Sequence, residues 1–261
     1  IAQCLVGSEM CIRDRVYLIT GGAGGIGSAV ARVIAKNIAN GILILHYNSN
    51  KNGAENLKKE IEKENKNIKV YTLQADLEIK EECEKLCDLI LKKFGVVDVL
   101  VNNAGYVEDK ELSERTYEDF EKTIKINLIA NFYLSKVLGY KMFEQKFGKI
   151  VNISSTSGLI LHSGSMNPTS IDYDASKAGV NALTKNFAQE FAPYVNVNAV
   201  APGWVDTPLN YELPEYVRQS ENEKILKNRW ASPEEIAELV WYLISDKADF
   251  INGSILSLIH I

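Results

Sequence analysis

The chain has 261 residues, of which 46% are hydrophobic and 24% are charged, and its formal net charge is −5. This length and hydrophobic content suffice to bury the core of one large α/β domain. The acidic balance gives no reason to expect nucleic acid or an anionic membrane as a partner, and no apolar run approaches the ~20 residues that cross a bilayer.

The cysteines and histidines form neither a disulfide framework nor a metal site. No Cys-x-x-Cys pair occurs among the four cysteines, and Cys83 and Cys87 are four residues apart. We therefore expect reduced thiols and a cytoplasmic protein. His46, His162 and His260 lack metal-ligand spacing, so no metal is expected.

Both ends of the chain differ in character from the rest. Residues 1–15 lack a helical or strand period, and they lack the basic start and small-residue cleavage site of a signal peptide. They resemble translated sequencing-adaptor sequence, as do residues 257–261. We expect both segments to be non-native and place the domain at residues 16–256.

The first predicted strand, residues 16–19, leads into a glycine-rich turn and then into a helical pattern with Val30 and Ile34 on one face. Glycines allow a backbone to approach a ligand closely, and the N–H groups at a helix start carry partial positive charge. A glycine cluster can also be a plain tight turn, but this place between strand and helix predicts a dinucleotide-binding loop. The residues of the turn are Thr20, Gly21, Gly22, Ala23, Gly24, Gly25, Ile26 and Gly27.

The second predicted strand, residues 42–45, is followed by polar residues and by no acid. NAD-preferring folds of this type usually carry Asp or Glu here to bind the ribose 2′-hydroxyl. Tyr47, Asn48, Ser49 and Lys51 instead offer donors that suit a 2′-phosphate. We therefore expect NADP(H) to be favoured over NAD(H), although the same residues could form a polar loop that opens the next helix.

The next elements are a helix over 52–64, with Leu57 and Ile61 facing inward, and a strand over 68–73. Asp76 follows that strand, where it could cap the next helix or hydrogen-bond an adenine.

A helix over 79–94 should turn Leu86, Leu89 and Ile90 towards the sheet, and a fourth strand covers 97–101. Repeats of strand then helix predict a single-domain, Rossmann-like, doubly wound parallel sheet in three α/β/α layers. The fourth strand ends at Asn102, Asn103, Ala104 and Gly105.

A long helical pattern covers 116–147 and is interrupted near Asn127. The strand over 149–153 then ends at Ser154 and Ser155, at the edge where ligands bind in open parallel sheets. In the segment 156–172 that follows, we expect His162 to be a bystander.

Tyr173 and Lys177 begin an amphipathic helix over 173–191, and four-residue spacing puts both side chains on one face. A cation beside a phenol pulls the phenol pKa down from about 10, which suits general acid–base chemistry. The same spacing also occurs at Tyr47/Lys51 and Tyr106/Lys110, so the spacing alone does not choose among the three pairs.

The last third of the chain begins with a strand over 195–200, and Pro202 and Gly203 then make a fixed turn. Residues 208–230 are polar and weakly periodic, which is typical of a mobile lid. Ser232 should cap a helix that runs to about residue 245. A last strand could start at Ile255.

Four motifs in this order resemble the short-chain dehydrogenase/reductase family, and especially its branch of 3-oxoacyl-acyl-carrier-protein reductases. The resemblance covers about residues 16–255. Its motifs are Thr20-Gly21-x-x-x-Gly25-Ile26-Gly27, Asn102-Asn103-Ala104-Gly105, Tyr173-x-x-x-Lys177 and Pro202-Gly203.

The resemblance implies four catalytic residues. Ser155 would bind the carbonyl oxygen, with a slip to Ser154 as the alternative, and Tyr173 would transfer the proton. Lys177 would lower the Tyr173 pKa and hold the nicotinamide ribose, and Asn127 would complete a proton relay to water.

The resemblance also implies a set of residues that hold the nicotinamide cofactor. These are Thr20, Gly21, Gly25, Ile26, Gly27, Tyr47, Asn48, Ser49, Asp76, Leu77, Asn103, Ala104, Gly105, Tyr173, Lys177, Pro202, Gly203, Val205 and Thr207.

The implied reaction is NADPH-dependent reduction of a 3-oxoacyl thioester carried by an acyl carrier. The alternatives are an alcohol, sugar or polyol, or hydroxysteroid dehydrogenase of the same fold, and a non-catalytic cofactor-sensing or scaffold protein. The segment 156–172 is longer than usual for the family and leaves the substrate open. The helices over 116–147 and 173–191 form oligomer interfaces in the family, which implies a homo-oligomer, either a tetramer or a dimer.

Overall fold

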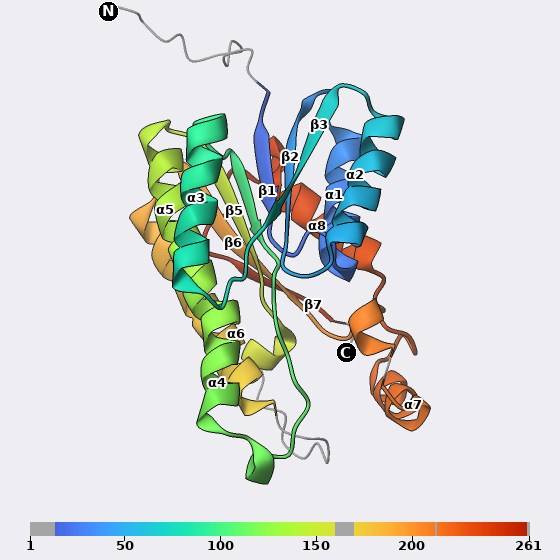
Figure 1. Cartoon of the computed structure of the whole chain (residues 1–261). Helices are drawn as coiled ribbons and strands as arrows, with labels where there is room; N and C mark the ends of the chain where they lie inside the picture. The colour runs from blue at the N-terminus through green and yellow to red at the C-terminus, as the bar shows by residue number, and fades with distance from the viewer. Residues whose placement is uncertain (1–13, 160–169, 212, 260–261) are drawn as a thin grey trace, which may run out of the picture.

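A single parallel sheet forms the middle layer of the molecule (Figure 1). The computed structural model describes residues 14–159, 170–211 and 213–259. The strand order is β3-β2-β1-β4-β5-β6-β7, and every pair is parallel. The strands are β1 (Val16–Ile19), β2 (Gly41–Tyr47), β3 (Ile68–Gln74), β4 (Val99–Asn102), β5 (Gly148–Ile153), β6 (Val195–Pro202) and β7 (Ile255–Leu258). The predicted doubly wound sheet is confirmed.

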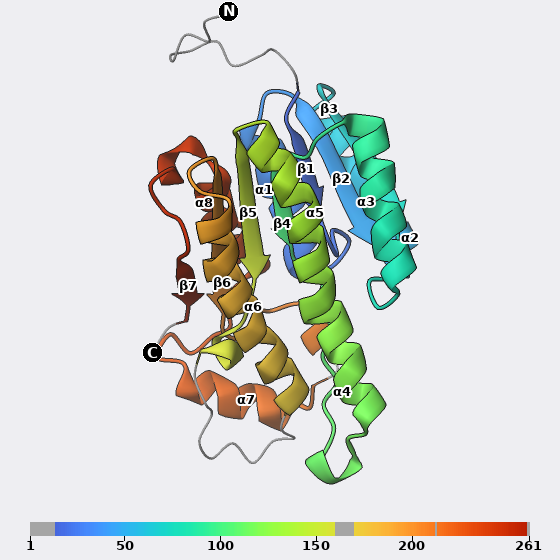
Figure 2. The ribbon, with the colours of Figure 1, turned by 90° about the vertical axis from the view of Figure 1, so that its left-hand side faces the viewer.

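Helices cover both faces of the sheet (Figures 1 and 2). One face carries α1 (Gly25–Asn37), α2 (Lys51–Glu64) and α8 (Pro233–Ile244). The other face carries α3 (Lys80–Phe94), α5 (Ala130–Glu144) and α6 (Ile171–Glu190). Two more helices, α4 (Tyr117–Ile124) and α7 (Glu215–Lys224), lie beyond the ends of the strands (Figure 2).

The hydrophobic core is divided into two clusters by the sheet. Side chains of neighbouring strand residues point to opposite faces, so Ile19 packs with α1 and α8 while Leu18 packs with α3 and α5. All four residues of β1 and of β4 are buried. These near-continuous apolar runs are what a parallel sheet covered on both faces requires.

The expected inward position of Leu89 is wrong, because 47% of its surface is exposed. The buried stripe of α3 consists of Cys83, Leu86, Cys87 and Ile90. At 100° per residue, Leu89 lies about 110° from the centre of that stripe. The two cysteines are free thiols that occupy core positions.

One of the two roles predicted for Asp76, capping of the next helix, is wrong. The helix begins one residue later than expected, at Lys80, and its N-cap residue is Ile79. The Asp76 Oδ1 atom instead accepts a hydrogen bond of 3.0 Å from the Glu78 N–H and closes a local turn.

The strands reach slightly beyond the predicted domain boundaries. Ser257 and Leu258 belong to β7 and pair in register with Ala201 and Pro202 of β6. At the other end, the Arg15 carbonyl accepts a 3.0 Å hydrogen bond from the Ile42 N–H. Within the described ranges, no helix combines the length and apolar character that a membrane span requires.

Candidate active site

The glycine-rich turn between β1 and α1 is a backbone cradle without room for side chains. Gly21 adopts a left-handed φ of 62°, which favours glycine. A Cβ added to Gly27 would lie 2.3 Å from the Gly21 carbonyl oxygen, and one added to Gly25 would lie 2.6 Å from Thr207 Cγ2. The N-cap residue of α1 is Gly24, which has no side chain to occupy the free N–H groups of the first helical turn. This geometry suits the phosphates of a dinucleotide.

Thr20 and Asn103 join two motifs that lie far apart in the sequence. The Thr20 hydroxyl oxygen accepts hydrogen bonds from the N–H groups of Asn103 and Ala104, at 2.9 and 3.0 Å. The Asn103 amide donates to the carbonyl oxygens of Thr20 and Gly21, at 2.9 and 3.1 Å. These side chains therefore hold the glycine turn against the end of β4.

Two of the three Tyr-x-x-x-Lys pairs do not lie on one helix. Tyr47 ends β2, whereas Lys51 begins α2. The Tyr106 hydroxyl donates to Glu108, and Lys110 forms a 2.6 Å ion pair with Asp119. In neither pair do the Tyr and Lys side chains share a helix face.

Tyr173 and Lys177 lie on the first two turns of α6, as predicted. Lys177 Nζ is 5.4 Å from the centroid of the Tyr173 ring, and it donates a 2.8 Å hydrogen bond to the Ile153 carbonyl at the end of β5. Burial lowers the pKa of Lys177 to about 8. A Cβ added to Gly105 would lie 3.7 Å from Lys177 Nζ, so the end of β4 borders the same space.

The expected lowering of the Tyr173 pKa does not occur in the free chain. Burial raises the pKa of Tyr173 to about 12, and the hydrogen bond with Ser155 opposes this rise only in part. Because Lys177 is itself buried, desolvation disfavours its charged form as well. Tyr173 is therefore a protonated phenol at neutral pH.

The two adjacent serines have different surroundings. The Ser154 hydroxyl is buried, donates to Asn181 Oδ1 at 2.6 Å and lies 3.3 Å from the Lys177 carbonyl oxygen, so it fastens β5 to α6. The Ser155 side chain instead hydrogen-bonds Tyr173 and accepts a 3.2 Å hydrogen bond from the Ser157 N–H. Ser155 is thus the serine that faces the phenol.

Asn127 lies at the interruption of the long helix, which is a five-residue π turn over Lys125–Ile129. Its Oδ1 accepts from the Tyr106 N–H at 2.7 Å, and its Nδ2 donates to the Tyr106 carbonyl at 2.8 Å and to Ser176 Oγ at 3.1 Å. The side chain therefore ties the segment after β4 to α6. Such π turns are frequent at functional sites.

The far edge of the predicted cofactor site is formed by the ends of β2 and β3. Tyr47 is buried, whereas Asn48 and Ser49 are exposed and free of any neighbouring acid in the sequence. Asp76 and Leu77 follow β3 after one residue, Ala75. The arrangement leaves the polar groups of residues 48–49 at the rim.

The turn after β6 closes over the glycine cradle. Val205 forms a parallel β-bridge with Ala231, and the buried Thr207 contacts the space beside Gly25. Pro202 ends β6, and the Gly203 N–H donates to the Leu258 carbonyl at 3.2 Å. The turn after β6 and the glycine cradle are thus neighbours.

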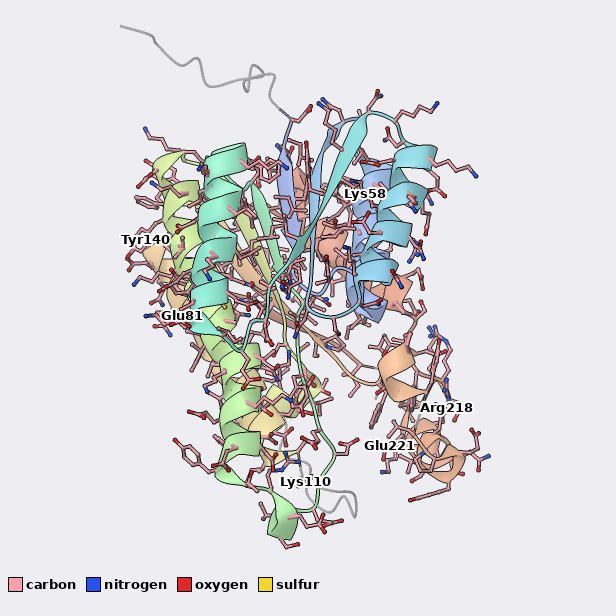
Figure 3. The ribbon with its side chains drawn as sticks, viewed as in Figure 1. Lys58, Glu81, Lys110, Tyr140, Arg218 and Glu221 are labelled. Carbon is pink, nitrogen blue, oxygen red and sulfur yellow. The ribbon has the colours of Figure 1, made fainter. Side chains whose placement is uncertain are left out.

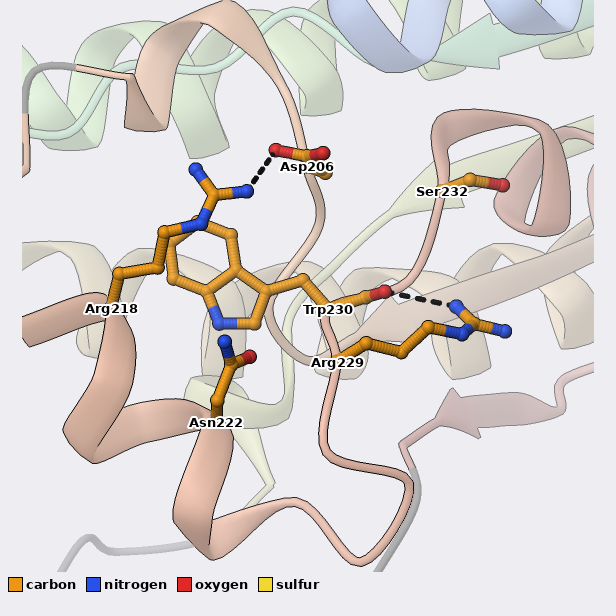
Figure 4. Close-up of a pocket in the computed structure, with 6 residues that line it drawn as sticks. All are labelled: Asp206, Arg218, Asn222, Arg229, Trp230 and Ser232. Carbon is orange, nitrogen blue, oxygen red and sulfur yellow. Dashed lines mark hydrogen bonds and ion pairs between the residues drawn. The ribbon is translucent and has the colours of Figure 1, made fainter. Parts of the chain in front are cut away.

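The predicted lid, residues 208–230, contains a ten-residue helix, α7. The weak hydrophobic periodicity of this segment did not indicate a helix. None of the α7 residues is buried, so the helix has no apolar stripe. Arg218 of α7 lies over the Trp230 ring at 4.5 Å and pairs with Asp206 at 2.6 Å, beside a cavity of about 280 Å³ (Figure 4).

A stacked tryptophan pair continues this contact. The rings of Trp204 and Trp230 are 5.0 Å apart and nearly parallel at 16°. The Trp204 indole donates a 3.0 Å hydrogen bond to Glu221, which projects from α7 as Arg218 does (Figure 3). These contacts fasten α7 to the turn after β6. His162 lies outside the described residues.

Sequence reasoning missed two buried side chains that support the site. Arg115 forms a 2.8 Å ion pair with Asp172, the residue before Tyr173, and both side chains are almost fully buried. His46 contacts the glycine cradle from the end of β2. The only sequence signal for His46 was a polar residue at the end of an apolar strand.

Comparisons with known proteins give the family of the chain. The family model described as short chain dehydrogenase matches residues 15–217. A 3-oxoacyl-[acyl-carrier-protein] reductase FabG of Thermotoga maritima is 34% identical over 250 residues, which cover 95% of this chain and 98% of the relative. The protein of the same name from Rickettsia conorii is 38% identical over 243 residues, covering 93% and 94%. Nodulation protein G of Azospirillum brasilense is 33% identical over 246 residues, covering 94% and 96%. The chain therefore belongs to the short-chain dehydrogenase family, and it is an oxidoreductase that acts on carbonyl or hydroxyl groups.

Proposed function

We propose that this chain is an NADPH-dependent reductase that converts 3-oxoacyl thioesters into 3-hydroxyacyl thioesters. The observation that carries the proposal is the hydrogen bond between Ser155 and Tyr173, with Lys177 on the same helix as Tyr173 and its ammonium near Gly105 at the end of β4. The names of two relatives, both 3-oxoacyl-[acyl-carrier-protein] reductases, support the substrate class.

The proposed cofactor site fits a nicotinamide dinucleotide, because the cradle admits backbone but no side chain. The phosphates would lie on the glycine turn and the start of α1. The polar rim at Asn48 and Ser49, without an acid, supports a 2′-phosphate and hence NADP(H). When bound, the cofactor supplies the hydride that reduces the carbonyl carbon.

The side chains of this protein would handle the oxygen and the proton. The Ser155 hydroxyl would donate to the carbonyl oxygen as negative charge develops there. Because the Tyr173 pKa is about 12, the phenol is protonated at neutral pH and can give its proton to that oxygen. Lys177, with a pKa of about 8, stays mostly charged and would stabilise the phenolate that remains. Asn127 would hold the π turn in place for proton resupply from water.

The test is oxidation of NADPH, and separately of NADH, with an acetoacetyl thioester as substrate. We expect turnover with NADPH in the wild type and none in Tyr173→Phe, with equal cofactor binding and equal circular dichroism. Full activity of Tyr173→Phe would refute the assignment of the proton donor. Cofactor binding without thioester turnover would favour an alcohol, polyol or steroid substrate. Absence of cofactor binding would overturn the proposed function and favour a scaffold protein.

We further propose that two copies of the chain associate through α5 and α6. Phe132 and Tyr140 are 40% and 44% exposed on α5, and Ala178 and Ala182 are exposed on α6, where small residues allow close approach. Tyr140 lies on the outer side of this layer (Figure 3). Light scattering should give a dimer or tetramer, and Ala178→Arg should shift it towards the monomer. The free, buried thiols support a cytoplasmic location.

A further inference from the structure

The side chain of His46 lies between the glycine cradle and the end of β3, and only 2% of the residue is exposed. Its Nδ1 atom accepts a 3.2 Å hydrogen bond from the Gly21 N–H. Its Nε2 atom is 3.0 Å from the Ala75 carbonyl oxygen. One imidazole therefore touches both the predicted phosphate turn and the residue before Asp76, at the predicted adenine edge.

These two contacts fix the protonation state of His46. A backbone N–H can only donate, so Nδ1 must direct its lone pair at Gly21. The single ring proton is then on Nε2, where it is donated to the Ala75 carbonyl. Protonation of Nδ1 would place its new N–H against the N–H of Gly21, and this contact with the turn would be lost.

The surroundings of His46 favour this neutral form. Burial lowers the pKa of His46, while the Ala75 carbonyl and the charge of Asp76 act in the opposite direction. On the other side of the ring, Gly21 and Gly22 carry no titratable group. The neutral ring is therefore the resident form at neutral pH.

The bond to Gly21 matters for the shape of the whole turn. Gly21 has the left-handed φ of 62°, and the next N–H, of Gly22, donates to the His46 carbonyl at 2.8 Å. The Gly21 carbonyl in turn accepts from the N–H of Gly24, at 3.0 Å. His46 thus accepts hydrogen bonds from the N–H groups of Gly21 and Gly22, at the start of the turn.

We propose that His46 is a positioning residue for the dinucleotide and that its protonation loosens the glycine turn, so that cofactor affinity falls in mildly acidic solution. This inference rests on the proposed function. Because one proton is involved, the dissociation constant should rise by about tenfold per pH unit once the pH is below the pKa of His46.

The decisive variant is His46→Asn. The Asn side-chain oxygen lies about where Nδ1 lies and can accept from the Gly21 N–H, but it takes no proton between pH 5 and 8. Cofactor dissociation constants should be measured over this range with NADH, since the 2′-phosphate of NADPH titrates near pH 6 itself. The wild type should lose affinity as the pH falls, and the variant should not.

Asn50→Ala provides a matched control. The Asn50 amide donates to the Ala23 carbonyl of the same turn at 3.3 Å, but it does not titrate. This variant should bind NADH more weakly at every pH and keep the slope of the wild type. An equal slope in wild type and His46→Asn, or a flat profile in the wild type, would overturn the inference.

The His46 pKa itself can be measured in the wild-type protein. The ring protons of His46 can be followed by NMR with and without cofactor, using the spectrum of His46→Asn only for assignment. Affinity and protonation are reciprocal, so bound NADH should lower the His46 pKa further. An unchanged pKa would refute the inference while leaving the proposed function intact. A chain that binds no nicotinamide at any pH would overturn both.

Discussion

The buried ion pair between Arg115 and Asp172 should be among the most sensitive points of the fold. The side chains are 3% and 1% exposed, and Arg115 Nη1 lies 2.8 Å from Asp172 Oδ2, which also accepts a 2.6 Å hydrogen bond from Thr123. Arg115 further donates to the carbonyl oxygens of Glu108 and Lys110, at 2.8 and 3.2 Å. The pair thus ties the segment after β4 to the first turn of α6.

Removing one partner leaves the other charge buried without a counter-charge. We expect Arg115→Met and Asp172→Leu each to lower the free energy of unfolding by about 3–5 kcal/mol. Within the described residues, Arg115 Nε and Asp172 Oδ1 are buried without hydrogen-bond partners, so the pair is incompletely compensated. The double variant, which buries no charge, should therefore lose much less free energy of unfolding than either single variant.

Urea unfolding of the four proteins measures this coupling directly. Arg32→Met and Glu60→Leu serve as controls, because that ion pair is half exposed and should contribute about 0.2–1 kcal/mol. A loss below about 1 kcal/mol in either single variant, or losses that add in the double variant, would show that the two buried charges are not coupled.

Three further predictions concern the site itself. Gly27→Ala should abolish cofactor binding, measured by fluorescence titration, because its Cβ would lie 2.3 Å from a carbonyl oxygen of the same turn; binding at wild-type affinity would contradict the cradle. Ser154→Ala should lower the free energy of unfolding by about 1–3 kcal/mol and keep most turnover, since it leaves the buried Asn181 Oδ1 without its donor. Ser155→Ala should keep the stability of the wild type and lose most turnover. Because the pKa of Lys177 is lowered to about 8, its ammonium is lost above that pH, and kcat for reduction should fall there. In Lys177→Arg this fall should move to higher pH, and an unmoved alkaline limb would assign it to another group.

The sequence predicted the elements and motifs best where the pattern is local. Apolar runs predicted six of the seven strands to within two residues at each end, and the start of the seventh. Ser232 caps α8 as expected, and its capping box with Glu235 adds a second hydrogen bond at the helix start. Among the α-helices of the described residues, α7 alone was not predicted, because it buries none of its residues and so has no hydrophobic period.

The properties that could not be predicted depend on contacts between distant segments. Arg115 and Asp172 are 57 positions apart, and neither carries a local signal. Adjacent serines cannot be told apart by pattern, but the buried hydroxyl of Ser154 turns to α6 and leaves Ser155 to the phenol. The raised pKa of Tyr173 follows from burial, which is a tertiary property.

The strand order has a consequence for how the chain is made. β1 lies inside the sheet although it is synthesised first, and its partner on one side, β2, follows closely. On the other side it waits for β4, since Tyr17 pairs with Val99. Until then, a growing chain exposes an unpaired edge of apolar strand, which is a template for aggregation. Once β4 is made, the unpaired edge passes to β4 itself, which waits for β5 at Gly148–Ile153. Ribosomal pauses before residue 148 should therefore be hazardous for this protein.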